Sequence, residues 1–526
     1  MANRQLFSTR HLIPTADAVN HHGAPAYSFS DRAALAQYAV TGCLNHTFYT
    51  SAQTQLADVL RLASRVDSRF LAQTAVYARR KGHMKDMPAL LLAVLAARPA
   101  VEDRLLLQSV FDRVIDNGKM LRNFVQIVRS GVTGRRSLGS CPKRLVQGWL
   151  DQRSDAAIFR ASVGSDPSLA DIIKMVHPKP KTASRRALYG YLLGRPYDVA
   201  ALPEIVQEYE TWKWLAYGGH AAGLEVPRVP FQMLTSQPLD ASAWRAIAAS
   251  AGWQMTRMNL RTFARHGVFE SPSMVHLVAE RLANAAEVRK ARVFPYQLLQ
   301  ASKMAAGLPV AIREALEAAL EVAISNVPSL RRSVRVAVCP DVSGSMRSPV
   351  TGHRRGATSA VRCVDVAALV AAAFVRTCRE TVVLPFEHRV VDVELRKRDS
   401  VLANARKLAS IGGGGTSCSA PLRRLVKMKS RVDLVILVSD NESWVDARRP
   451  GATETMQQWE RLRRDNPGAR LVCIDIQPYA TSQAPSRPDI LNVGGFSDAV
   501  FSVIGDFVAG THVGEHLVGS IDRIVV

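Results

Sequence analysis

The chain has 526 residues, 47% of them hydrophobic and 21% charged, with 68 Lys and Arg residues against 45 Asp and Glu. This composition excludes a disordered or collagen-like chain and leaves enough apolar material for two or more domains. The formal net charge of +23 favours a polyanionic partner. The seven cysteines are never spaced as CxxC, and no stretch has the features of a membrane span or a signal peptide, so we expect a cytoplasmic protein without disulfides or zinc fingers.

Residues up to about 330 show the apolar spacing of short helices. Apolar residues recur at intervals of three and four, and Gly, Pro or polar residues separate the segments. The predicted helices at the start of this part cover residues 31–41, 51–65, 68–82, 86–98, 100–116, 119–130 and 141–151. Because such helices cannot bury an apolar face alone, we expect a degenerate HEAT-like array over residues 27–330, preceded by a flexible N-terminal arm at residues 1–26.

Positive charge is concentrated in the helical part. Residues 61–200 hold 25 basic and 11 acidic residues, a net charge of +14, and residues 331–526 carry a further +8. Many basic residues between 119 and 186 lie at predicted helix starts or in loops, where long side chains can converge on phosphates without entering a core. The candidate RNA-binding residues are Lys119, Arg122, Arg129, Arg135, Arg136, Lys143, Arg144, Arg160, Lys174, His177, Lys179, Lys181, Arg185 and Arg186.

Aromatic residues are sparse in this basic segment, where Phe124, Trp149, Phe159 and Tyr189 are far apart. Their spacing argues against a strip of stacked single-stranded bases and favours recognition of duplex RNA by backbone and shape. Two other interpretations stay open. An individual Arg can lie on a solvated helix face, and His177, next to Pro178, can be a helix-end residue that caps backbone carbonyls.

After Pro328 the periodicity changes. Short β-branched runs at residues 335–341, 381–386, 432–440 and 470–476 alternate with predicted helices at 362–379, 400–410, 418–429, 454–466 and 497–509. Strands that alternate with helices are typical of a parallel, doubly wound sheet with both faces covered. The sequence therefore predicts a multidomain protein, an all-α helical-repeat part followed by an α/β Rossmann-like domain at residues 331–526.

Polar residues in three loops of this second domain form a candidate metal site. Asp341, Ser343 and Ser345 follow the first strand in DVSGSM, Thr416 follows four glycines in IGGGGTSCSAPL, and Asp440 ends a strand in LVILVSDNESW. Two carboxylates and three hydroxyls at the carboxyl edge of a sheet suit one hard divalent cation, Mg²⁺. The set resembles the metal-ion-dependent adhesion site of von Willebrand factor A-type domains. We expect a coordination position to be left for the acidic group of a partner.

Rival interpretations of these loops are weaker. IGGGGT lacks the Lys that precedes the Ser or Thr of a phosphate-binding loop. Asp341 and Asp440 alone supply too few carboxylates for a two-metal nuclease. A degenerate or empty site and a hydrolase remain open as alternatives. Glu442 matches no ligand position and is expected to be a solvated loop residue.

The two parts together resemble the TROVE-domain family, that of the Ro ribonucleoprotein autoantigen and its bacterial relatives. The motifs that carry the resemblance are AYSFSDRAALAQYAVTGCLNHTFYT, ADIIKMVHPKP, KARVFPYQLLQA, DVSGSM, GGGTSCSAPL and VSDNESW. The resemblance implies that the HEAT-like repeats close into a ring whose ends the von Willebrand factor A-type domain joins. It also implies that small noncoding Y RNAs bind the basic outer surface and that 3′ ends of misfolded or immature RNAs enter the ring.

The same resemblance implies a role and partners. The protein is expected to act in RNA quality control and maturation, as a protein monomer in a ribonucleoprotein linked to polynucleotide phosphorylase or other exoribonucleases, and not to be an enzyme itself. His177 and Arg160 fall where the family contacts RNA, whereas the family's next basic position falls at Gly164. The alternative is a metal-dependent protein-interaction module whose basic helical array binds an acidic partner other than RNA.

Overall fold

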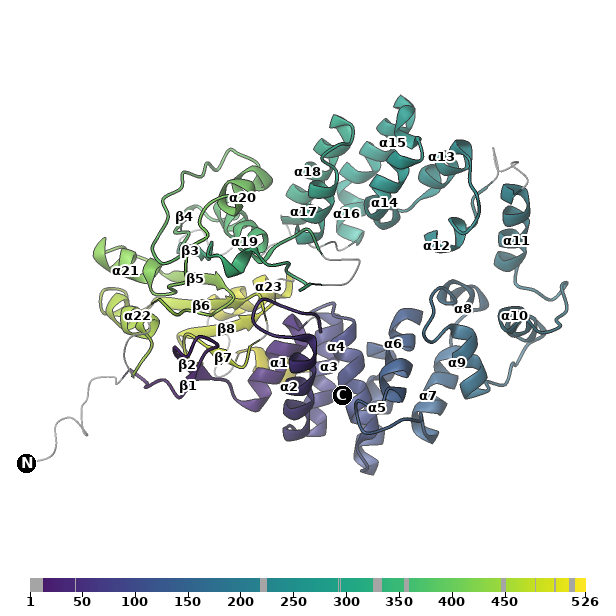
Figure 1. Ribbon diagram of the computed structural model, residues 1–526, viewed down its shortest axis with the longest axis horizontal. Helices are drawn as coiled ribbons and strands as arrows, with labels where there is room; N and C mark the ends of the chain where they lie inside the picture. The colour runs from purple at the N-terminus through teal and green to yellow at the C-terminus, as the bar shows by residue number, and fades with distance from the viewer. Residues whose placement is uncertain are drawn as a thin grey trace, which may run out of the picture. The chain divides into compact units, whose positions relative to one another are not determined.

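The structure is a computed structural model that describes residues 13–42, 44–217, 225–291, 293, 295–324, 334–353, 359–445, 451–477, 479–495, 498–509 and 516–526. The chain divides into two compact units (Figure 1). One unit comprises residues 1–66, 294–300 and 324–525, and the other comprises residues 67–293 and 301–323. The expected border near residue 330 marks the change in secondary structure, but residues 27–66 group with the α/β part rather than with the helical array.

The second unit is helical, as predicted. Its helical elements are α3 (Ser68–Arg80), α4 (Asp86–Ala97), α5 (Val101–Val114), α6 (Gly118–Arg129), α7 (Ser140–Asp151), α8 (Asp155–Ala161), α9 (Leu169–Val176), α10 (Ala183–Leu193), α11 (Glu204–Tyr217), α12 (Phe231–Leu234), α13 (Ala241–Ser250), α14 (Trp253–Arg265), η1 (Val268–Glu270), α15 (Pro272–Ala283), α16 (Ala285–Ala291), α17 (Pro295–Met304) and α18 (Val310–Ile324). Helix α17 lies partly in each unit. The predicted helices between residues 68 and 151 are confirmed.

Side-chain caps fix where these helices begin. Asp67 accepts a hydrogen bond from the third residue of α3, and Asn117 does the same for α6. Ser168 and Asp171 form a reciprocal capping box at α9. Trp149 of α7 is buried and donates its indole N–H to a backbone oxygen just after α5, at 2.6 Å. Successive helices are therefore held by polar contacts at their ends as well as by apolar packing.

The first unit contains a parallel five-stranded sheet in the order β4-β3-β5-β6-β8. Its strands are β3 (Arg335–Pro340), β4 (Glu380–Val383), β5 (Leu434–Ser439), β6 (Arg470–Asp475) and β8 (Ile490–Gly494). The helical elements after β3 are η2 (Ser345–Arg347), α19 (Cys363–Thr377), α20 (Val401–Ala409), α21 (Ala420–Lys427), α22 (Glu454–Asp465), α23 (Asp498–Ala509) and α24 (His516–Asp522). The predicted α/β domain is confirmed, and β8, which the sequence analysis missed, is its fifth strand.

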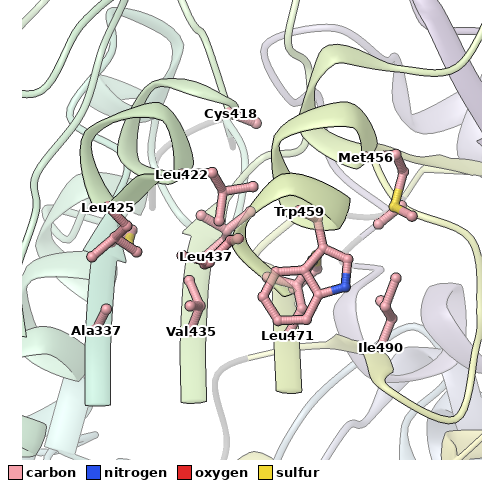
Figure 2. Close-up of a cluster of buried hydrophobic side chains, with 14 of the residues drawn as sticks. Ala337, Cys418, Leu422, Leu425, Val435, Leu437, Met456, Trp459, Leu471 and Ile490 are labelled. Carbon is pink, nitrogen blue, oxygen red and sulfur yellow. The ribbon is translucent and has the colours of Figure 1, made fainter. Parts of the chain in front are cut away.

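Helices α21 and α22 cover one face of this sheet (Figure 2). Leu422 and Leu425 of α21 and Met456 and Trp459 of α22 are all at most 2% exposed. The Trp459 indole N–H donates to the Asp489 carboxylate at 2.9 Å, so this large side chain is buried without an unsatisfied donor. The strand residues beneath them are Ala337, Val435, Leu437, Leu471 and Ile490. Helix α19 packs on β3, β4 and β5.

Residues 13–66 extend the α/β unit. Strand β1 (Ala18–Val19) pairs antiparallel with β2 (Pro25–Ser28), which pairs with β7 (Thr481–Ser482). Helix α1 (Asp31–Thr41) packs on β8 and on α24, and α2 (Ala52–Arg65) packs on α1. The flexible arm expected for residues 1–26 thus differs from the structure after residue 12, because residues 18–26 form paired strands and their turn. Residues 1–12 lie outside the described residues.

No helix in the described part of the chain combines the length and the apolar character needed to cross a membrane. The described cysteines are all buried, and none of them is part of a disulfide. Burial raises the pKa of the Cys339 and Cys473 thiols, so both stay protonated. These cysteines therefore behave as small apolar core residues.

Candidate functional site

The predicted metal ligands gather at the carboxyl edge of the parallel sheet. Strand β3 leads directly into Asp341, and its neighbour β5 leads into Asp440. These two strands form the point where the strand order reverses, because β4 lies on one side of the pair and β6 on the other. Loops diverge at such a switch point, and ligands of open α/β sheets bind there. The fold thus brings the two carboxylates to one place.

Three of the five predicted ligands form one hydrogen-bonded group, and a fourth, Asp440, lies beside it. The Asp341 carboxylate accepts the Ser343 N–H at 2.8 Å and the Ser439 hydroxyl at 2.6 Å. The Ser345 hydroxyl lies 3.3 Å from the Ser343 hydroxyl and close to the Asp440 carboxylate. The four predicted ligands are each at most 7% exposed. They are therefore held in place by one another and by strand β5.

The glycine loop carries the fifth predicted ligand, Thr416, which is 1% exposed. The Gly344 N–H donates to the Gly414 carbonyl at 2.9 Å, and the Trp444 N–H donates to the Thr416 carbonyl at 3.2 Å. Gly412 has a φ of +77°, and a Cβ there would lie 2.3 Å from a backbone oxygen of the first ligand loop. Glycine is required for this close approach, so the glycine run positions Thr416 beside the other ligand loops.

Burial opposes the ionisation of both carboxylates. Desolvation raises the pKa of Asp341 to about 6, and desolvation together with the Asp341 charge raises the pKa of Asp440 to about 7. Burial also raises the pKa of Asp475, at the end of β6, and the charges of Asp440 and Glu442 add to this effect. The Asp475 Oδ1 atom is buried without a hydrogen-bond partner. A cation would relieve this concentration of negative charge.

The donor set fits a hard divalent cation. Carboxylate and hydroxyl oxygens are the side-chain donors that Mg²⁺ and Ca²⁺ accept in proteins, whereas soft metals prefer thiolate or imidazole. Among the described residues, no three His, Cys, Asp or Glu side chains are arranged to hold a metal. A cation here would therefore depend on the mixed set of Asp341, Asp440 and hydroxyl groups. Bound Mg²⁺ stays a prediction.

Glu442 is not the solvated loop residue that the sequence suggested, because its side chain is 1% exposed. Its Oε1 atom lies 2.9 Å from His21 Nδ1, and its Oε2 atom accepts the His21 N–H at 3.1 Å. The Tyr49 hydroxyl lies 3.4 Å from His22 Nε2 and close to the predicted ligand Ser345. His21 and Tyr49 could not be predicted from the sequence, because 421 positions separate His21 from Glu442 and no local spacing links them.

The predicted RNA-binding residues lie on α6 to α10 and the connections between these helices (Figure 1). The helices form one block, because α6 packs on α8 and α9, α7 on α9, and α10 on both α8 and α9. Lys143 is half-buried. The exposed members of the set are Lys119, Arg129, Arg136, Arg144, Arg160, Lys174, His177, Lys179, Lys181 and Arg186, hereafter the basic face.

Arg185 does not behave as the sequence analysis expected. Its side chain is only 12% exposed and forms an ion pair with Asp155 of α8. It also donates to the carbonyls of Leu150 at 2.7 Å and Arg153 at 2.5 Å. These bonds join α10 to the end of α7 and to α8. The expectation that this side chain stays outside the packed structure is wrong, and Arg185 serves the fold.

Arg122 and Arg135 are also half-buried and bonded to backbone carbonyls. Arg122 donates to the Ala161 carbonyl at 3.0 Å, and burial lowers the pKa of its guanidinium. Arg135 donates to the Ala96 carbonyl and, at 3.3 Å, to the Leu138 carbonyl. A Cβ on Gly164 would lie 2.7 Å from the Arg122 guanidinium. The Arg122 guanidinium thus lies beside Gly164, the position at which the family's expected basic residue is missing.

His177 terminates α9 in the left-handed conformation, with φ 52° and ψ 60°, and its N–H donates to the Ile173 carbonyl. The helix-end interpretation is confirmed for its backbone. Gln147 of α7 satisfies the neighbouring Val176 carbonyl at 2.6 Å. The His177 side chain is exposed, so its backbone role leaves the imidazole free to face a ligand.

A second basic surface lies on the α/β unit, in a pocket of about 770 Å³. Arg424 lies 3.6 Å from Asp392, whereas Arg389 and Lys427 form no ion pair in the described part of the chain. The charged residues that line the pocket are Glu387, His388, Arg389, Asp392, Arg423, Arg424 and Lys427. The net charge of this half is evident in the sequence, whereas the pocket depends on tertiary packing.

Two family models match parts of the chain, and curated relatives are similar to it. The Ro60 vWA domain model matches residues 335–508, and the TROVE domain model matches residues 193–311. The chain is 26% identical over 515 residues to RNA-binding protein RO60 of Deinococcus radiodurans, covering 93% of this chain and 95% of the relative. It is 26% identical over 248 residues to RNA-binding protein RO60 of Caenorhabditis elegans, covering 44% of this chain and 36% of the relative.

The crystal structure of the Deinococcus radiodurans RO (RSR) protein has a similar fold. The TM-score is 0.67 at 24% sequence identity, and the match covers 92% of this chain and all of that one. The predicted resemblance to the TROVE-domain family and the predicted fold class are confirmed. The basic face lies N-terminal to the residues that match the TROVE domain, so its assignment depends on this chain's own charges.

The different surroundings of Arg185 and Arg186 predict different effects of mutation. Arg185→Ala should lower the free energy of unfolding by about 2 kcal/mol, because it leaves Asp155 and two carbonyls without their charged donor. Arg186→Ala removes the same charge from an exposed position and should change stability by less than about 0.5 kcal/mol. Urea denaturation followed by circular dichroism measures both. Equal effects of the two substitutions would show that Arg185 does not hold the fold.

Proposed function

Because the chain carries both a TROVE domain and a Ro60 vWA domain, we propose that it is an RNA-binding protein of Ro ribonucleoprotein particles. Its curated relatives are named as RNA-binding proteins. The observation that carries the proposal for this chain is the basic face on α6 to α10. Exposed cations on one block of helices attract a polyanion and release the counterions of its phosphates.

The chemistry of the basic face favours contact with the RNA backbone. The aromatic side chains of this region, Phe124, Trp149, Phe159 and Tyr189, are at most 5% exposed. They therefore cannot stack on bases, and recognition is left to phosphate contacts and duplex shape. Y RNAs, which are small and structured, are the proposed ligands of this surface. The 3′ ends of misfolded or immature RNAs are the proposed second class of ligand.

The proposed role is RNA quality control and maturation in the cytoplasm, with polynucleotide phosphorylase or another exoribonuclease supplying the cleavage. The protein itself acts as a monomeric scaffold within the particle and not as an enzyme. The two carboxylates at the sheet edge, Asp341 and Asp440, are buried and share their loops with hydroxyl groups. This arrangement supports binding of one cation more than activation of a water molecule for RNA hydrolysis.

We further propose that Asp341, Ser343, Ser345, Thr416 and Asp440 hold one divalent cation, Mg²⁺. When bound, the cation supplies positive charge that offsets the two buried carboxylates. The hydrogen bonds of Ser343 and Ser439 to Asp341 keep that carboxylate oriented. The glycine loop keeps Thr416 beside them.

Removing exposed charge from the basic face should weaken RNA binding and its dependence on salt. The test variant carries Arg144→Ala, Lys174→Ala, Lys179→Ala and Arg186→Ala, which leave the half-buried Arg185 intact. Each phosphate contact contributes roughly 0.7–0.9 to the slope of log affinity against log salt. The slope should therefore become shallower by about 3, as measured by gel-shift titration of a structured RNA at three salt concentrations.

A charge-matched control separates local contacts from net charge. Arg261→Ala, Arg265→Ala, Arg289→Ala and Lys290→Ala remove four exposed charges from other helices of the same unit. This control should retain most of the slope. An unchanged slope in the test variant would move the RNA surface elsewhere, and Arg389→Ala with Lys427→Ala would then test the second basic pocket. Purified protein that carries no RNA and binds none would favour the acidic-partner alternative.

The purified chain should not cleave RNA. Labelled Y-type RNA incubated with the protein and Mg²⁺ should stay full length, whereas addition of polynucleotide phosphorylase and phosphate should shorten unstructured 3′ ends. Metal-dependent cleavage that persists through purification and disappears in Asp440→Ala would contradict the scaffold role. Asp392→Ala, at an exposed position, is the control substitution.

The cation should stabilise the protein more at high pH than at low pH. The folded-state pKa values of Asp341 and Asp440, about 6 and about 7, lie above the ordinary 3.8. Without a cation, these groups hold protons in the folded state that they have lost in the unfolded state. Their contribution to stability is therefore lost as pH rises through about 4 to 8. Mg²⁺ replaces the protons and should offset this loss.

Thermal unfolding measures this linkage. At 100 times the dissociation constant, Mg²⁺ should add about 2.7 kcal/mol at pH 8 and much less at pH 5. Asp341→Asn should abolish the Mg²⁺ effect, whereas Asp392→Asn should retain it. The assigned site would be ruled out if Mg²⁺ stabilised the protein equally at both pH values. It would also be ruled out if Mg²⁺ stabilised Asp341→Asn as much as the unchanged protein.

A further inference from the structure

A tight turn near the start of the chain covers the loop that carries Asp440. Asn20 donates from Nδ2 to the Ser443 carbonyl at 2.7 Å, and its Oδ1 accepts the N–H groups of His22 and Ala24, each at 3.0 Å. Asn20 is 6% exposed. One side chain therefore both shapes the turn and attaches it to the α/β unit.

His21 adds a second attachment, to Glu442. The backbone N–H and the ring Nδ1 of His21 contact the two carboxylate oxygens of Glu442 at 3.1 Å and 2.9 Å. Glu442 is two residues beyond Asp440, and its backbone N–H lies 3.4 Å from the Asp440 carboxylate. The turn thus hydrogen-bonds both the backbone of this loop, at Ser443, and its acidic side chain, Glu442.

Aromatic rings connect the turn to the first ligand loop. The His21 ring stacks on Tyr49 with centroids 5.7 Å apart, and both rings lie edge-on to Tyr479, at 5.2 Å and 6.0 Å. The His22 ring lies 5.4 Å from that of Trp444. The Tyr49 hydroxyl lies 3.4 Å from His22 Nε2 and close to Ser345, a predicted ligand. Burial raises the pKa of Tyr49, and the neighbouring charge of Asp440 adds to the effect, so the phenol stays protonated.

These contacts leave the predicted ligands inaccessible. Exposure is 0% for Asp341, 2% for Asp440 and 1% for Thr416. A partner protein that donated a carboxylate to the cation would have to displace the Asn20–His22 turn and Tyr49. The chain already has its own acidic group there, the buried Glu442.

We propose that the turn Asn20–His22, Tyr49 and Glu442 close the cation site from within the same chain. The site then acts as an internal clasp that attaches residues 20–49 to the α/β unit, and not as an adhesion site for an acidic partner. This inference rests on the proposed cation site. It assigns Tyr49 and His21 as positioning residues for Ser345 and for the loop of Asp440.

The clasp couples cation binding to order in the N-terminal turn. If closing the turn raises the affinity for the cation by some factor, binding of the cation must favour the closed turn by the same factor. The backbone N–H of His21 reports this directly, because its hydrogen bond to Glu442 exists only when the turn is closed. Hydrogen exchange and cation affinity are therefore two independent readings of one coupling.

The test is hydrogen exchange of the full-length protein by mass spectrometry, with Mg²⁺ or with EDTA, together with calorimetric titration of Mg²⁺. Mg²⁺ should slow exchange in peptides that cover residues 18–24. Tyr49→Phe keeps the ring and removes the hydroxyl, and it should weaken Mg²⁺ binding about five- to tenfold. His21→Ala should speed exchange of the turn and weaken Mg²⁺ binding, although it alters no predicted ligand.

Tyr27→Phe is the matched control, because the Tyr27 hydroxyl bonds the Pro14 carbonyl at 2.6 Å and not a ligand loop. It should leave Mg²⁺ affinity unchanged. Two results would overturn the clasp alone. In the first, Mg²⁺ binds the unchanged protein but does not slow exchange of residues 18–24. In the second, Tyr49→Phe and His21→Ala both bind Mg²⁺ with full affinity. Failure of the unchanged protein to bind Mg²⁺ would overturn the cation site as well. An increase in Mg²⁺ affinity with added acetate would indicate an open position and would also contradict the clasp.

Discussion

The cost of burying two carboxylates side by side determines much of the structure of the α/β unit. Asp341 and Asp440 follow neighbouring strands, so the parallel pairing of β3 with β5 brings their charges together away from water. Such charges are tolerated only when hydrogen bonds, protons or a cation compensate them. Ser343 and Ser439 supply hydrogen bonds to Asp341. The glycine loop and the N-terminal turn then enclose a site that cannot stay both dry and fully ionised without a counter-charge.

Positive charge is handled differently in the helical unit. Arg185 and Arg186 are adjacent, yet one satisfies Asp155 and two helix-end carbonyls while the other is exposed. The long side chain and several donors of arginine suit both tasks, so residue type alone does not separate them. Arg122 and Arg135 resemble Arg185, because both donate hydrogen bonds to carbonyls near helix ends. Net charge in this segment therefore overstates the number of cations available to a phosphate backbone.

Local chemistry explains which features the sequence could predict. The 3.6-residue apolar period located the helices from α3 to α7, and the β-branched runs located β3 and β5, because each pattern is contained in one segment. The spacing of Asp341, Ser343 and Ser345 could also be read locally. Strand β8 is ILNVG, whose Asn and Gly weaken the strand signal, and β1 has only two residues. The contacts of His21 with Glu442 and of Arg185 with Asp155 depend on tertiary packing, which no spacing records.

The same distinction bears on what each unit can do. A phosphate backbone needs cations that lack a strong internal partner and face solvent, as Arg144 and Arg186 do. An ion pair such as Lys181 with Asp151, in which the Lys side chain is 77% exposed, contributes little and can exchange Asp151 for a phosphate. The proposed cation site has the opposite character, because its donors are enclosed and the neighbouring Glu442 carboxylate is already bound by His21. The proposed RNA recognition is therefore assigned to the exposed charges, and the enclosed carboxylates are assigned to the proposed ordering of the chain around them.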